Sequence, residues 1–292
     1  GLEEYLFSRK TLNFKSLLTN SVGTKTLLDL AEKSSAKFLL VSTVDVYEGV
    51  ASDSGLDNYF GHTSVEENKF RVTESKRFAE AMVWEHYKKF ETNVRIVRLP
   101  EVYGPGMDLE ATGFLGPLLD DLLHHRDLKV YGDERRQEYY LHINDAVSGL
   151  VKAMFKEGTR GEIYSLVGEE PVKLLKIAFM LRSLADRRTE IGFAEGVGSV
   201  PSATRSVERE NLKKLEWSPE IGLKSGVVET LESFDYKPSK SSFKPADLIR
   251  EKLAEKALKR SERTIAGDVA DDQRGEITKV PFDETTEDSP ES

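Results

Sequence analysis

The sequence contains no cysteine and no long apolar run, and these two absences exclude whole classes of protein. Without cysteine the chain cannot form a disulfide scaffold, a cysteine-ligated zinc site, an iron–sulfur cluster or a thiol nucleophile. No apolar stretch approaches the ~18 residues that a membrane span needs, so we expect no membrane partner. No basic segment followed by an apolar stretch marks a signal peptide, which predicts a cytoplasmic location.

The charge of the chain is concentrated near its C-terminus. Of a formal net charge of −9 over 292 residues, residues 268–292 carry −7, from nine acidic and two basic side chains. The remaining residues are nearly neutral, so nucleic-acid binding has no electrostatic support and no nucleic-acid partner is expected. Residues 237–292 are rich in charge and poor in large apolar side chains. This composition predicts a charged helix followed by a disordered acidic tail.

Apolar spacing predicts helices and strands that alternate along the chain. Helical spacing occurs in residues 12–32 and 73–90, and short apolar runs typical of buried parallel strands follow at 37–43 and 93–99. This order predicts an α/β fold with a Rossmann-type, doubly wound parallel sheet. The second half continues the mixture. Helices are expected at 114–125, 144–155, 174–185, 208–215, 224–234 and 244–263, and strands at 128–132 and 162–167.

Six short motifs follow one another in residues 1–234, each weak by itself but ordered along the chain. They are Asn20-x-x-Gly23-Thr24-x-x-Leu27-Leu28-x-x-Ala31, Ser42-Thr43-Val44-Asp45-Val46-Tyr47, Val72-x-x-x-Lys76-x-x-x-Glu80, Arg98-x-x-Glu101-x-Tyr103-Gly104-Pro105, Val130-Tyr131-Gly132 with residues 141–146, and Leu215-Glu216-Trp217-Ser218-Pro219 with Gly222 and Gly226.

Together these motifs resemble the extended short-chain dehydrogenases/reductases, and among them the NAD-dependent nucleotide-sugar epimerases and dehydratases. A further stretch at residues 58–61, Asn-Tyr-Phe-Gly, is most similar to the UDP-glucuronate decarboxylases. The resemblance implies a partial dinucleotide-binding Rossmann domain over residues 1–110. It implies a smaller, mixed α/β and mainly substrate-binding region over residues 111–236, some segments of which return to the Rossmann core.

The family begins with a strand, a glycine-rich turn and a helix whose N-terminus holds the pyrophosphate of the dinucleotide. No such pattern precedes the first motif; the nearest set of glycines, Gly192, Gly196 and Gly198, comes late and follows no convincing strand. We therefore expect an N-terminally truncated Rossmann domain, from which roughly 80 residues are missing, a length that fits βαβ units of about 30 residues.

The implied chemistry needs a phenol to take a proton from a sugar hydroxyl while a hydride moves to NAD. A lysine one helical turn away lowers the phenol pKa by its charge and holds the nicotinamide ribose. By resemblance Lys76 is this lysine, with both a catalytic and a cofactor-binding role. Thr43 would bind the sugar oxygen and Asp45 would assist proton transfer. The tyrosine position itself is occupied by Val72.

The resemblance also implies the binding residues. Pro100, Glu101 and Val102 would line the nicotinamide pocket. Tyr131, Arg136 and Arg205 would bind the nucleotide-sugar substrate, with Arg205 on its diphosphate. The five histidines show no metal-ligand spacing, so no metal site is expected.

Three hypotheses follow. The chain is an NAD-dependent enzyme acting on a UDP- or dTDP-sugar, or it is a degenerate member that binds a nucleotide or a partner without turnover, or it is a piece of a longer gene product. Val72, Val44 and Glu101, where the family has a tyrosine, a hydroxyl and an asparagine, favour the second. Apolar residues lie almost all round the helix at 73–90, which indicates burial on more than one side. The resemblance implies dimerisation through a four-helix bundle that includes this helix, so a homodimer is expected.

Overall fold

The computed structural model describes residues 17–47, 68–110, 113–131, 137–168, 170–186, 188–194, 207 and 210–239, without the side chains of residues 68–72, 131, 194 and 210. The chain divides into two compact units, Gly1–Ser241 and Ser242–Ser292, and every described residue belongs to the first. The expected helix at 244–263 and the acidic tail lie outside the described residues.

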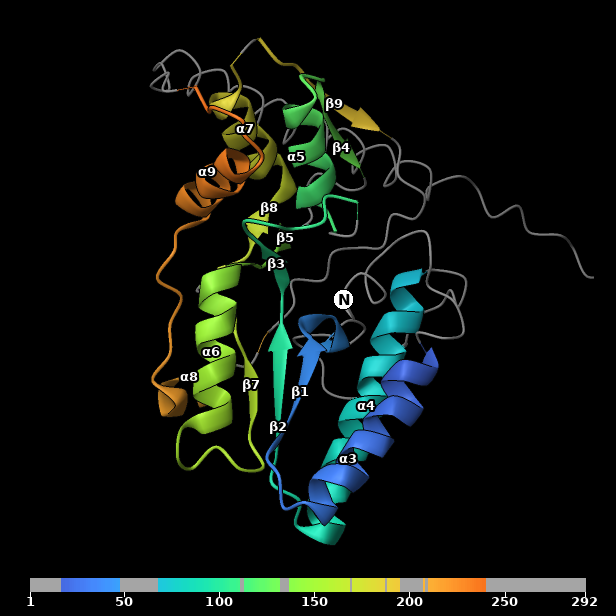
Figure 1. The fold of residues 1–292 in the computed structure, drawn as a ribbon. Helices are drawn as coiled ribbons and strands as arrows, with labels where there is room; N and C mark the ends of the chain where they lie inside the picture. Colours follow the sequence, from blue (N-terminus) through green and yellow to red (C-terminus); the bar gives the residue numbers. More distant parts are fainter. Residues whose placement is uncertain are drawn as a thin grey trace, which may run out of the picture. The chain divides into compact units, whose positions relative to one another are not determined.

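A parallel sheet with helices on both faces forms the first half of the fold (Figure 1). Its strands are in the order β1-β2-β7, with Leu40 beside Ile96 and Val97 beside Tyr164. Helices α3 and α4 cover one face and α6 the other, which is the Rossmann-type arrangement predicted from the sequence. The elements are β1 (Phe38–Thr43), β2 (Val94–Leu99), β7 (Ile163–Ser165), α3 (Thr24–Lys33), α4 (Asn68–Phe90), α6 (Ile143–Phe155) and α8 (Glu210–Leu215).

Each face of the sheet has its own hydrophobic core. On the side of α3 and α4, Leu28, Val83 and Ile96 are almost completely buried together. On the side of α6, Tyr164 and Trp217 belong to a second buried cluster. Burial of such side chains contributes about 1.5–3 kcal/mol each, so these two clusters fix the helices to the sheet.

A third core holds together the second half of the fold, which Figure 1 shows beyond the arrowheads of β1 and β2. Its centre is Leu119, Leu128 and Ile177, each with no exposed surface. Strand β4 pairs in parallel with β9, β3 pairs in parallel with β6, and β5 pairs antiparallel with β8. The elements are α5 (Leu115–Leu123), β4 (Leu128–Tyr131), α7 (Leu174–Leu184), β9 (Ile191–Ala194), α9 (Leu223–Ser233), β3 (Glu101–Tyr103), β6 (Tyr140–His142), β5 (Gln137–Glu138) and β8 (Val172–Lys173).

The structure corrects two expectations about burial. The strand at 37–43 was expected to be covered on both faces, but Val41 keeps 37% of its surface exposed. The helix at 12–32 was expected to bury a broad apolar face, yet Val22, Leu27 and Leu30 are each more than half exposed. The described part of that segment also contains a π-helical turn at Thr19–Gly23 that the apolar spacing did not predict. None of the described helices combines the length and the apolar character that crossing a membrane requires.

Candidate active site

Lys76 joins α4 to the carboxyl end of β1. Its ammonium donates a hydrogen bond of 2.9 Å to the carbonyl oxygen of Val41, and the residue is only 6% exposed. Thr43 ends the same strand, and its Oγ1 accepts a bond of 3.1 Å from the backbone N–H of Asp45. The three residues predicted to be catalytic thus lie at the end of the sheet where α/β proteins bind ligands. Val72 lies one helical turn before Lys76 in the backbone of α4.

Within the described part of the chain, two buried hydroxyl groups on β1 and α4, the elements that Lys76 joins, have no hydrogen-bond partner. Ser42 Oγ lies next to Val41 in β1, and Thr73 Oγ1 lies one turn before Lys76 in α4. Ser42 is 4% exposed and Thr73 not at all. A buried polar group that makes no hydrogen bond costs about 1–3 kcal/mol, so each such group calls for an explanation. A polar ligand that binds against these elements would supply the missing partners.

Asn20 holds the part of α4 that carries Lys76. Its side-chain amide donates a hydrogen bond of 3.0 Å to Ser75 Oγ, and the residue is buried. Asn20 lies in the π-helical turn before α3, a feature that recurs at functional sites. Asn20 belongs to the first sequence motif, but the motif assigns it no role, because no residue pattern signals a π-helical turn.

A largely buried ion pair connects α4 to β2. The guanidinium of Arg98 donates to both carboxylate oxygens of Glu80, at 3.0 and 2.6 Å, and to the hydroxyl of Tyr47 at 2.7 Å. Tyr47 and Ser165 also share a hydrogen bond of 3.0 Å. Burial alone would lower the pKa of Arg98, but the hydrogen bonds and charge of Glu80 raise it above its ordinary value. The network therefore fixes three of the sequence motifs and β7 around the site.

Glu101, one of the three residues predicted to line the nicotinamide pocket, caps a helix in this structure. Its carboxylate accepts hydrogen bonds from the backbone N–H groups of Phe114 and Leu115, at 3.1 and 2.9 Å, where α5 begins. A Cβ atom at Gly113 would lie 2.6 Å from Glu101 Oε2, so the glycine makes room for the carboxylate. Such capping satisfies N–H groups that a helix leaves unpaired. Pro100 is buried and Val102 half-buried beside it.

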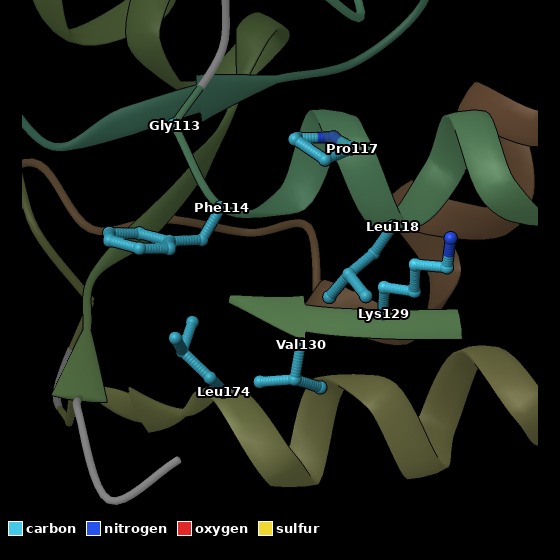
Figure 2. Close-up of a pocket in the computed structure, with 7 residues that line it drawn as sticks. All are labelled: Gly113, Phe114, Pro117, Leu118, Lys129, Val130 and Leu174. Atoms are coloured by element: carbon cyan, nitrogen blue, oxygen red, sulfur yellow. The ribbon is translucent and has the colours of Figure 1, made fainter. Parts of the chain in front are cut away.

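The residues predicted to bind substrate are described only in part. Tyr131 ends β4, but its side chain is not described, and Arg136 and Arg205 lie outside the described residues. Next to Tyr131 lies a small, mainly apolar pocket between α5, β4 and α7 (Figure 2). It is lined by Gly113, Phe114, Pro117, Leu118, Lys129, Val130 and Leu174.

Tyr103, from the fourth motif, is a packing residue. It is 2% exposed, and its ring meets that of His142 edge-on with centroids 5.4 Å apart. Burial raises the pKa of the Tyr103 phenol well above its usual value, and the charges of Asp145 and Glu229 act in the same direction. A phenol with a raised pKa is a poor proton acceptor near neutral pH. Its burial and ring contact identify Tyr103 as a packing residue of the fold.

Comparison with known proteins agrees with the motifs. Residues 10–166 match the NAD dependent epimerase/dehydratase family. UDP-glucuronic acid decarboxylase 1 of Danio rerio is 28% identical over 220 residues, which cover 75% of this chain and 52% of that protein. UDP-glucuronic acid decarboxylase 1 of Arabidopsis thaliana is 26% identical over 220 residues, covering 75% and 50%. The chain thus spans about half the length of these two relatives.

Solved structures share the fold. The UDP-glucose 4-epimerase of Thermotoga maritima has a TM-score of 0.65 at 19% identity, covering 76% of this chain and 71% of the epimerase. The dTDP-glucose 4,6-dehydratase of Bacillus anthracis has a TM-score of 0.63 at 23% identity, covering 75% and 68%. The fold and the family predicted from the motifs are therefore confirmed, and the chain belongs to the NAD-dependent epimerase/dehydratase family.

Proposed function

We propose that this chain is part of an NAD-dependent enzyme that converts a nucleotide sugar, and that its residues contact the nicotinamide and the sugar. The observation that carries the proposal is the position of Lys76, whose ammonium lies 2.9 Å from the Val41 carbonyl at the carboxyl end of β1. The unpartnered hydroxyls of Ser42 and Thr73 support it, because a ribose or an amide bound there would satisfy them. The similarity to UDP-glucuronic acid decarboxylases makes a UDP-sugar acid the first substrate to test.

NAD, when bound, supplies the hydride acceptor. Lys76 would donate to the nicotinamide ribose, and its charge would lower the pKa of an adjacent hydroxyl. Thr43 Oγ1 already accepts from the Asp45 N–H, so its own proton can be donated to a sugar oxygen. Asp45 would receive or return the proton. Pro100 and Val102 would form the wall beside the nicotinamide.

The side chains proposed for the nucleotide sugar are Tyr131, Arg136 and Arg205. Two arginines suit a diphosphate because the planar guanidinium donates two parallel hydrogen bonds to phosphate oxygens. Glu101, also predicted near the nicotinamide, would act indirectly by holding the start of α5 next to the pocket of Figure 2.

We also propose that the protein acts as a homodimer in the cytoplasm, with α3 and α4 at the interface. Leu30 on α3 and Phe78 on α4 are 60% and 55% exposed, an arrangement that favours burial against a second copy. Light scattering coupled to size exclusion tests this. Leu30→Asp should convert the dimer to a monomer. The control is Phe155→Asp in α6, where Phe155 is 66% exposed, and this variant should leave the dimer intact. A wild-type monomer at all concentrations would rule out the dimer.

The enzymatic proposal is tested with the full gene product and with this chain, each incubated with NAD+ and UDP-glucuronate. Calorimetry measures NAD+ binding and NMR follows the sugar. Lys76→Met should weaken NAD+ binding about ten-fold or more, the loss of one charged hydrogen-bonding group. Lys88→Met, an exposed lysine of the same helix, is the control. Unchanged binding in Lys76→Met would exclude the role given to Lys76.

The same assay decides whether the chain turns substrate over. Conversion without any change at position 72 would show that another group replaces the missing phenol. Binding without conversion in the full gene product, followed by conversion in Val72→Tyr, would identify a binding protein that lost its catalytic acid. Absence of NAD+ binding by the full gene product would contradict the proposal as a whole.

A further inference from the structure

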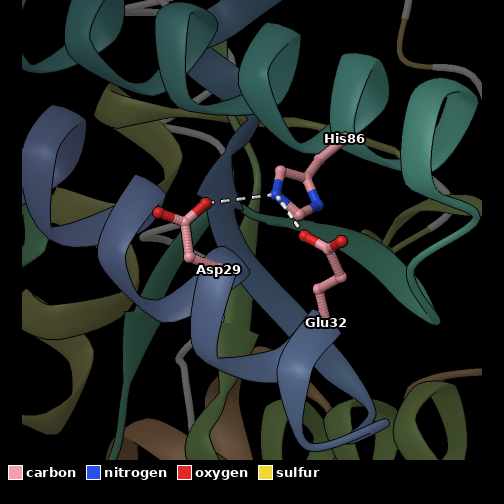
Figure 3. A group of neighbouring side chains, drawn as sticks. All are labelled: Asp29, Glu32 and His86. Atoms are coloured by element: carbon pink, nitrogen blue, oxygen red, sulfur yellow. Dashed lines mark hydrogen bonds and ion pairs between the residues drawn. The ribbon is translucent and has the colours of Figure 1, made fainter.

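Three side chains of types that can ligate a metal ion meet between two helices, far from Lys76. Asp29 and Glu32 project from α3 and His86 from α4 (Figure 3). His86 Nε2 lies 3.4 Å from Asp29 Oδ1 and 3.6 Å from Glu32 Oε2. The three ligand atoms all lie within 4.8 Å of one another. His86 follows Lys76 by ten positions in α4, a rise of about 15 Å, so this cluster is separate from the proposed active site.

The spacing of these atoms suits a tetrahedral ion. Bonds of about 2.0–2.2 Å to a tetrahedral zinc ion separate neighbouring ligand atoms by roughly 3.3–3.6 Å. The separations of His86 Nε2 from Asp29 Oδ1 and from Glu32 Oε2, 3.4 and 3.6 Å, fall in this range, and the two carboxylate atoms lie within 4.8 Å of each other. One imidazole nitrogen and two carboxylate oxygens form a ligand set typical of Zn²⁺ and its neighbours Co²⁺ and Ni²⁺. The fourth position would be left to water.

The imidazole is already oriented. His86 Nδ1 shares a hydrogen bond of 2.8 Å with the hydroxyl of buried Thr92, and the Phe90 ring packs 4.7 Å from the imidazole between centroids. Metal-ligating histidines are commonly held through the second ring nitrogen in this way, which directs Nε2 toward the ion. The carboxylates of Asp29 and Glu32 are 39% and 38% exposed, so an ion can reach them from solvent.

The electrostatics also favour a cation. Asp29 and Glu32 lie in the last two turns of α3 and His86 in the second-last turn of α4, where helix dipoles place partial negative charge. Lys25 opposes the binding of a cation, because its ammonium already pairs with Asp29 Oδ2 at 2.6 Å. The pair leaves Asp29 Oδ1 facing His86.

We propose that Asp29, Glu32 and His86 bind a divalent transition metal, Zn²⁺ in the first place, which links α3 to α4. The histidine lies 57 residues from Asp29, so the pair has no short sequence spacing. This is why the sequence indicated no metal site. The competing arrangement of the same side chains is a protonated imidazole between two carboxylates, without any metal.

The test uses the full chain without a polyhistidine tag. Zn²⁺ binding is measured by calorimetry, and Co²⁺ binding by its visible absorption, which reports the coordination geometry. One ion per chain is expected. Glu32→Gln and His86→Gln should each weaken binding about ten-fold or more. The first changes an exposed carboxylate, so it should leave the fold intact. Lys25→Met should strengthen binding, because it removes the cation that competes at Asp29.

His124→Gln is the matched control, since His124 also pairs with a carboxylate, Asp120, at 3.0 Å, but on an exposed helix end. It should leave the affinity unchanged. The proposal is overturned if the wild-type chain binds no Zn²⁺ or Co²⁺. It is also overturned if Glu32→Gln and His86→Gln bind as tightly as the wild type, since the ion would then be held elsewhere, for instance by the acidic tail.

Discussion

Gly149 in α6 lies directly against the indole ring of Trp217. A Cβ atom at position 149 would lie 3.1 Å from that ring and 2.3 Å from Leu166 Cδ1. The indole N–H donates a hydrogen bond of 3.0 Å to Ser148 Oγ, the residue before the glycine. The tryptophan of the last motif is therefore fixed onto α6 by packing and one hydrogen bond. This motif therefore serves the packing of the fold.

Gly149→Ala should destabilise the protein although alanine favours helices. Inserting a methyl group into a packed core costs about 1–3 kcal/mol, which exceeds the gain of about 1 kcal/mol in helix propensity. Urea unfolding followed by circular dichroism measures the difference. Gly23→Ala is the control, because its Cβ would meet only Thr19 Cγ2, at 4.0 Å. Equal stability of the two variants would contradict the packing argument.

The ion pair of Glu80 with Arg98 predicts a pronounced non-additivity. Glu80→Leu leaves the buried guanidinium without its carboxylate and should cost about 3–5 kcal/mol. Arg98→Met should likewise be destabilising. The double variant Glu80→Leu/Arg98→Met should be more stable than either single variant, because no buried charge remains uncompensated. Urea unfolding of all four proteins gives the coupling energy, and additive effects would show that the pair contributes no coupling.

The sequence predicted the parts of the fold whose side chains repeat with a clear period. Strands β1 and β2 and helix α4 lie where apolar spacing placed them, and α4 begins at Asn68, before the predicted start at 73. Strands β5 and β8, two residues each, are too short to show a period. Their pairing depends on contacts between distant segments, which a local pattern does not contain.

The same limit applies to the sites. The motif around Lys76 was recognisable because its residues are close in sequence. The cap that Glu101 provides for α5 and the contact of Asn20 with Ser75 join residues 13 and 55 positions apart. Only the folded chain brings such pairs together. The family resemblance placed Glu101 beside the nicotinamide, and the fold adds that its carboxylate accepts hydrogen bonds from two backbone N–H groups of α5.

Alkaline pH should weaken the fold through Tyr164. Burial raises its pKa to about 12, and the charge of Glu162 adds to the effect, whereas an unfolded tyrosine has a pKa near 10. Because its pKa is raised in the folded state, the neutral phenol contributes to the free energy of unfolding. This contribution is complete below pH ~10 and is lost as the pH rises toward about 12. Tyr164→Phe should therefore flatten the pH dependence of urea unfolding in this window. Tyr103, whose pKa burial also raises, contributes to the remaining slope. An unchanged slope in Tyr164→Phe would contradict this assignment.

The hydrogen bond from Asn20 to Ser75 predicts that Asn20, which has no proposed role in the chemistry, influences NAD+ affinity. Asn20→Ala and Ser75→Ala each remove one bond of 3.0 Å in a buried position and should each cost about 1–3 kcal/mol. Because the two variants share this bond, the loss in the double variant should be smaller than the sum of the two single losses. If the bond positions Lys76, NAD+ affinity should fall in parallel with stability in both variants. Thr24→Val is the control, because it removes the hydrogen bond of the Thr24 hydroxyl to the Asn20 carbonyl. It should lower stability and leave NAD+ affinity unchanged. Additive losses in the double variant would show that Asn20 and Ser75 act independently.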